Sequence, residues 1–208
     1  MKVLLNEMRK PLLKVMFSLL LTSVGAMAQD GLLVHLKLNE AGGELAKDSS
    51  GNGHDGTLVG VAVANSQWVE GKSDNAVSLG IGHVEVTDLP EMTSTTWAAW
   101  VRLDADSSYG AAISAAFEGA GAGHSLGFHT GGTVRHPRVL WNHANGHISI
   151  IAPDPVELGE WNHLAVTYNA DSEDITLYVN GQAKGNGKVG TTPFSVVHLG
   201  QRASSKNC

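Results

Sequence analysis

The chain is poor in cysteine, in charged residues and in aromatic residues. Its single cysteine, Cys208, excludes an internal disulfide, so the fold must depend on its hydrophobic core. Only 16% of the 208 residues are charged and 6% are aromatic, whereas 42% are hydrophobic, which excludes the composition of a disordered chain. Acidic residues outnumber basic ones by 20 to 14, so the positive charge of a nucleic-acid-binding protein is missing.

Long hydrophobic runs are also missing. A membrane-spanning helix needs about 20 apolar residues, and the apolar run Val15–Ala26 is shorter than that. We therefore expect no membrane-spanning segment. A small-residue cleavage site, Ala26-Met27-Ala28, follows the run, and basic residues precede it (Lys2, Arg9, Lys10 and Lys14). We interpret residues 1–28 as a secretory signal peptide cleaved near Ala28, with Met1 or Met8 as the start. The alternative is a buried N-terminal helix.

Cleavage would leave residues 29–208 as one secreted domain, periplasmic or extracellular. Losing four basic residues and Glu7 would change its net charge from −6 to −9. Such an acidic surface suits divalent cations better than phosphates.

The whole chain has 25 glycines, and after residue 28 short apolar segments alternate with polar residues, which predicts an all-β fold of about ten strands. Leu32–Leu38 alternates in this way, and Asn180-Gly181 after an alternating run predicts a hairpin. Trp97–Leu103 is apolar on both faces, which predicts a central strand covered on both sides. Further strands are expected at 83–86, 111–117, 125–129, 134–141, 147–151, 164–168 and 175–179, and a glycine-rich turn at Gly185–Gly190.

Four segments together resemble the laminin-G-like jelly rolls of the concanavalin A-like lectin/glucanase superfamily. They are residues 33–60, with Asp48-Ser-Ser-Gly-Asn-Gly53; residues 68–86; the tryptophan strand 95–104; and residues 160–185, with Trp161-x-His163 and Leu177-Tyr-Val-Asn-Gly181. The resemblance implies an antiparallel β-sandwich of the jelly-roll type.

One feature departs from that family. After Val197–Arg202 the family usually continues with a final strand that pairs beside the first strand, whereas here a polar tail ends at Cys208. We therefore expect a jelly roll that lacks its final strand and has an exposed sheet edge next to residues 32–38. Such an edge favours pairing with another chain.

A glycine-rich loop carries the candidate metal ligands. Asp48, Asn52 and His54 lie close together in it, and oxygen ligands on a tightly curled backbone suit Ca²⁺. The resemblance implies calcium bound by Asp48 and by backbone oxygens of Asn52 and His54. The alternative is that Asp48 and Asn52 only form Asx turns.

A second cluster carries the candidate sugar-binding residues. Trp141, Asn142 and Asn145 lie on an expected loop, where an indole could stack on a sugar and amides could bind its hydroxyls. The alternative is that Trp141 belongs to the core. The resemblance assigns Trp100 and Trp161 to the core.

No pair of carboxylates has the spacing that places both in one cleft, as glycoside hydrolysis requires. Glu85, Asp88 and Glu91 are three apart, and three more acidic residues lie in an expected turn (Asp171, Glu173 and Asp174). A zinc site at His136, His143 and His147 is disfavoured, because Asn142 and Gly146 favour a turn over a helix. We expect a secreted, non-catalytic, calcium-assisted module that binds an extracellular glycan or protein. The alternatives are a structural or adhesion module completed by another chain and, less favoured, a glycoside hydrolase.

Overall fold

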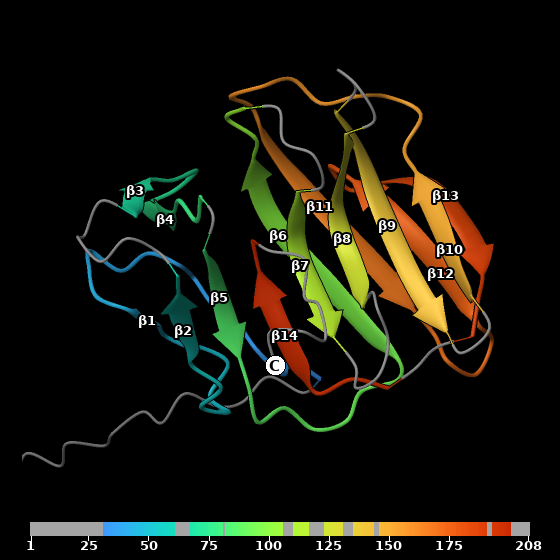
Figure 1. The fold of residues 1–208 in the computed structure, drawn as a ribbon, viewed down its shortest axis with the longest axis horizontal. Coiled ribbons are helices and arrows are strands. Elements are labelled where there is room, and N and C mark those ends of the chain that lie inside the picture. The colour runs from blue at the N-terminus through green and yellow to red at the C-terminus, as the bar shows by residue number, and fades with distance from the viewer. Residues whose placement is uncertain are drawn as a thin grey trace, which may run out of the picture.

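The computed structural model describes residues 31–60, 67–80, 82–105, 110–116, 123–130, 135–143, 146–190 and 193–200. Within these residues the elements are fourteen β-strands, all of whose pairings are antiparallel, which confirms the expected all-β class (Figure 1). Residues 1–28, where a signal peptide is expected, and the tail after Gly200 lie outside the described residues. The described part has no helix long and apolar enough to cross a membrane.

The larger sheet has eight strands. Its last described strand in the chain, β14, lies between β5 and β7 (Figure 1). In spatial order the strands are β1 (Leu45–Ala46), β2 (Gly56–Val59), β5 (His83–Val86), β14 (Val196–Leu199), β7 (Ala111–Ala116), β8 (His124–Thr130), β9 (Arg135–His143) and β10 (Gly146–Ile151).

The second sheet has four strands and packs against the first. In spatial order these are β13 (Gln182–Lys188), β12 (Asp174–Val179), β11 (Trp161–Tyr168) and β6 (Thr95–Arg102). A small sheet of β3 (Trp68–Glu70) and β4 (Asn75–Val77) lies beside them. The predicted hairpin joins β12 to β13: Asn180 and Gly181 have φ angles of 50° and 79°, as a two-residue hairpin turn requires.

The main core fills the space between the two sheets. Strands β11 and β12 alternate strictly between buried and less buried residues, so one face of each supplies core side chains such as Leu164 and Leu177. The opposite wall includes Trp141, whose ring centroid is 5.1 Å from that of Trp97 and 5.1 Å from that of Tyr168. Burial of these large apolar side chains is the main stabilising contribution to the fold.

Three expectations about strands are wrong. Leu32–Leu38 does not form a strand, and only an isolated bridge joins Leu36 to Asp48, so the predicted sheet edge beside this segment is not formed. The segment instead turns at Leu38, which has a φ of 55°, and Leu36 and Leu38 pack on a second small core around Leu58 and Trp68.

The tryptophan strand, β6, is not covered on both sides. It is the last strand of the four-stranded sheet, and Trp100 on its outer face is 49% exposed. The expected turn at Gly185–Gly190 is largely strand, because β13 continues to Lys188. Glycine is required there by close packing: a Cβ at Gly185 or Gly187 would collide with the isoleucine side chains of β10.

Candidate functional site

The predicted sugar-binding cluster at Trp141 is not a surface site. Trp141 lies on β9, is 0% exposed and stacks on the buried ring of His124 at 4.1 Å. Asn142 is also buried, and its side-chain amide donates a hydrogen bond to the carbonyl of Gly123. Asn145 lies outside the described residues. The expected loop is wrong because β9 extends to His143 and carries Trp141 between the two sheets.

The glycine-rich loop is organised around the carboxylate of Asp48. Its Oδ1 accepts hydrogen bonds from the backbone N–H of His35 and Ser50, both at 2.9 Å. Its Oδ2 accepts from the Ser50 hydroxyl at 2.7 Å and from the backbone N–H of His54 at 3.0 Å. Burial raises the pKa of Asp48, but the hydrogen bonds from His35, Ser50 and His54 outweigh it and lower the pKa to about 2.

These contacts bear on the expected calcium site. A carboxylate has about four lone-pair positions, and Asp48 already accepts four hydrogen bonds. The Asn52 amide donates to the carbonyls of Leu32 and Leu33, at 2.8 and 3.0 Å, so it ties the loop to the N-terminal segment. The side chain of Asp48 therefore does not fit a calcium ion in this arrangement. A comparison of melting temperatures in calcium and in EDTA tests the calcium site that the resemblance implied at Asp48, Asn52 and His54.

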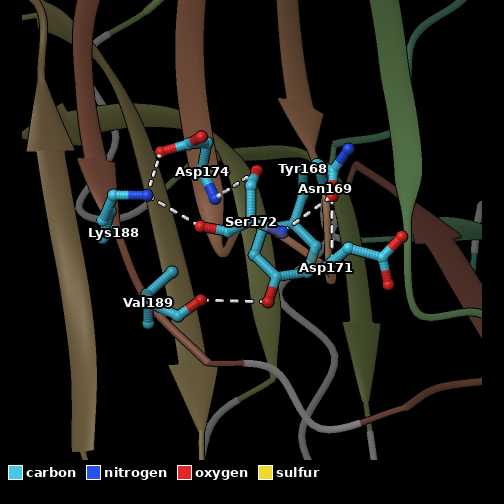
Figure 2. A network of polar contacts seen from close by, with 7 residues as sticks. All are labelled: Tyr168, Asn169, Asp171, Ser172, Asp174, Lys188 and Val189. Atoms are coloured by element: carbon cyan, nitrogen blue, oxygen red, sulfur yellow. Dashed lines mark hydrogen bonds and ion pairs between the residues drawn. The ribbon is translucent and has the colours of Figure 1, made fainter.

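The acidic residues near 171–174 belong to a structural turn (Figure 2). Oδ1 of Asn169 accepts the backbone N–H groups of Asp171 and Ser172, at 2.9 and 3.0 Å. The Asp174 carboxylate pairs with the Lys188 ammonium at 2.7 Å, and that ion pair and hydrogen bond lower the pKa of Asp174. The Asp171 carboxylate points away from Asp174, so the two do not face one cleft (Figure 2).

A groove of about 460 Å³ lies at the other end of β11. One wall is the segment 152–160, which leads from β10 into β11, and the other is the β12–β13 hairpin. We call it the end groove. The residues that line it include one tryptophan, three side-chain amides, three carboxylates and one ammonium group: Trp161, Asn162, Asn180, Gln182, Asp154, Glu157, Glu160 and Lys184.

Hydrogen bonds hold the polar floor of the end groove. The Asn180 amide donates to Oδ1 of Asn162 at 3.0 Å, and Oδ1 of Asn180 accepts the backbone N–H of His163 at 2.9 Å. Lys184 pairs with Asp154 at 3.3 Å across the groove wall. With three carboxylates and one lysine, the lining is acidic and rich in planar polar groups.

Trp161 supplies the aromatic surface of the end groove, which the sequence prediction missed by placing it in the core. It is partly exposed, and the Arg102 guanidinium lies 5.3 Å from its ring centroid. The strand pattern contained the signal: Leu164 and Val166 face the core, so period-two alternation directs Trp161 and His163 to the outer face.

The sequence matches the family profile of the concanavalin A-like lectin/glucanases superfamily over residues 70–207. The chain therefore belongs to this superfamily, as the four segments suggested. Comparison with curated protein sequences finds no match.

Two solved structures share the fold. One is domain 4 of AbnA, an extracellular arabinanase from Geobacillus stearothermophilus, in complex with arabinotriose, at 18% identity and a TM-score of 0.55. That match covers 74% of this chain and 76% of the domain. The other is the sialidase of Trypanosoma rangeli in complex with sialic acid, at 19% identity and a TM-score of 0.53. It covers 85% of this chain but only 28% of the sialidase.

Proposed function

We propose that the chain is a secreted, non-catalytic module that binds an extracellular glycan in the end groove. The observation that carries the proposal is the position of the partly exposed Trp161 beside the amides of Asn162, Asn180 and Gln182. An indole packs against the C–H face of a sugar ring, and planar amides and carboxylates can each bind adjacent hydroxyls. Because the amides of Asn162 and Asn180 are already held by hydrogen bonds, little of their side-chain entropy is lost on binding.

The fold supports this proposal in general terms only. Proteins of this superfamily include both lectins and glucanases, so the fold does not identify the ligand. The Geobacillus domain contains arabinotriose in its structure, which makes arabinotriose a sensible first probe for this chain. Calcium is left out of the proposal, because the Asp48 carboxylate is already fully hydrogen-bonded.

A glycan panel tests binding against catalysis. The purified chain would be run in affinity gels that contain arabinan, xylan, β-glucan or mucin, titrated with arabinotriose, and assayed for released reducing ends. We expect slower migration in at least one gel and no increase in reducing ends over a blank. Turnover of any of these polymers would support a glycoside hydrolase instead. Unchanged migration in every gel, together with self-association in solution, would support the structural or adhesion alternative.

A further inference from the structure

Two histidines and a glutamate meet on the larger sheet, remote in sequence from the end groove. His83 and Glu85 are two residues apart on β5, so their side chains leave the same face, opposite to the buried Val84 and Val86. His198 lies on β14 directly opposite Glu85 in the antiparallel register. The sheet therefore places all three side chains side by side.

The distances between these groups are short. Nε2 of His198 lies 3.2 Å from Oε1 of Glu85, and the ring centroids of His198 and His83 are 4.5 Å apart. One ligand atom from each of the three residues lies within 4.8 Å of the others.

We propose that His83, Glu85 and His198 bind one divalent transition-metal ion, with zinc as the best-suited metal. Two imidazole nitrogens and a carboxylate oxygen are a ligand set that Zn²⁺ favours and that Ca²⁺, which prefers oxygen, does not. Tetrahedral zinc with bonds of about 2.0–2.1 Å places neighbouring ligand atoms about 3.3 Å apart. The pair of His198 and Glu85 already has this spacing, and His83 needs to move inward by about 1.5 Å at most, within reach of a side-chain rotation.

One ligand of the proposed site is buried and another is partly exposed, which suits a metal site. The His198 side chain is only 3% exposed, so packing holds it, whereas that of Glu85 is 33% exposed, so an ion can reach the group from solvent. Three protein ligands leave room for water or an oxygen atom of a bound molecule at the ion.

The test is metal titration of the full chain without an affinity tag, after it has been stripped of metal. Isothermal titration with Zn²⁺ would be repeated on His83→Gln, Glu85→Gln and the control His147→Gln, whose exposed histidine lies on β10. Titration with Co²⁺ would report the ligand field through its visible absorption. Thermal melts in EDTA would check that each variant is folded.

We expect one equivalent of Zn²⁺ to bind to the wild type and to His147→Gln with the same affinity. Each ligand variant should bind at least about tenfold more weakly, which is the smallest loss expected for a change at a metal centre. Absence of binding to the wild type would overturn the proposal. Binding of one equivalent that neither His83→Gln nor Glu85→Gln weakens would also overturn it, because another set of ligands would then hold the ion.

Discussion

The side chain of Asn180 donates a 3.0 Å hydrogen bond to Oδ1 of the buried Asn162, which joins the β12–β13 hairpin to the beginning of β11. Asn180 also has a left-handed φ of 50°, and its own Oδ1 accepts the backbone N–H of His163. One residue therefore fixes the turn and the floor of the end groove.

Replacing Asn180 should separate these two roles. We expect Asn180→Ala to lower the free energy of unfolding by about 2 kcal/mol, because it strains the left-handed backbone and leaves the Asn162 carbonyl without its partner. Asn180→Gly removes the same hydrogen bonds without the strain and should cost about 1 kcal/mol. Urea unfolding measures both. Equal losses in the two variants would show that backbone strain contributes nothing.

The low pKa of Asp48 predicts a specific acid sensitivity. The pKa of Asp48 is 3.8 in the unfolded chain and is lowered to about 2 on folding, so the ionised carboxylate stabilises the native state at pH values above 3.8. That contribution disappears as the pH falls toward 2. After allowance for solvent screening, the contribution should be about 1–2 kcal/mol at neutral pH.

The comparison is between the wild type and Asp48→Asn, unfolded with urea from neutral pH down to about pH 2. The stability difference between them should be largest at neutral pH and should shrink below about pH 4. Asp171→Asn, an exposed turn residue, serves as the control and should show no such trend. A difference that does not change with pH would contradict the role assigned to the ionised carboxylate.

Calcium should not change the stability of the glycine-rich loop, because hydrogen bonds from the chain already saturate Asp48. We expect the same melting temperature in excess calcium and in EDTA, since only a ligand of the native state raises it. A rise in calcium that is lost in Asp48→Asn would show that the loop rearranges around the ion, as the family resemblance implied.

Gly127 on β8 lies against the backbone of β7, where the register between the two strands shifts. A Cβ at this position would overlap the carbonyl oxygen of Gly110 and lie 2.8 Å from the Cα of Ala111. We expect Gly127→Ala to cost about 3 kcal/mol of unfolding free energy, measured in urea. Gly187→Ala should cost less, because the atom it meets is the mobile tip of the Ile148 side chain. The reverse order would contradict this packing.

The strands were predictable from the sequence because period-two alternation persists in β5, β11 and β12. Strand β9 breaks that rule: Leu140, Trp141 and Asn142 are buried in succession, so nothing local distinguished Trp141 from a surface residue. Trp161 does follow the rule, since the alternation of β11 directs its side chain to the outer face of the sheet.

The sequence did not predict which strands pair with one another, and therefore not which distant residues meet. His83-x-Glu85 is visible as two polar groups on one face of a strand, but His198 lies 113 residues from Glu85. Only the antiparallel register of β14 against β5 brings it to them. The end groove likewise depends on how the segment 152–160 lies against a distant hairpin.

Affinity electrophoresis of three forms of the chain tests the glycan-binding proposal most directly. The wild type, Trp161→Ala and Trp100→Ala would be compared in the polysaccharide gel that retards the wild type most. Trp100 is the matched control, since it is an exposed tryptophan on the same sheet that does not line the end groove. We predict that Trp161→Ala loses the retardation, whereas Trp100→Ala retains it. If Trp161→Ala is still retarded as strongly as the wild type, the assignment of the end groove as the glycan site is contradicted. This holds whether or not Trp100→Ala loses its retardation.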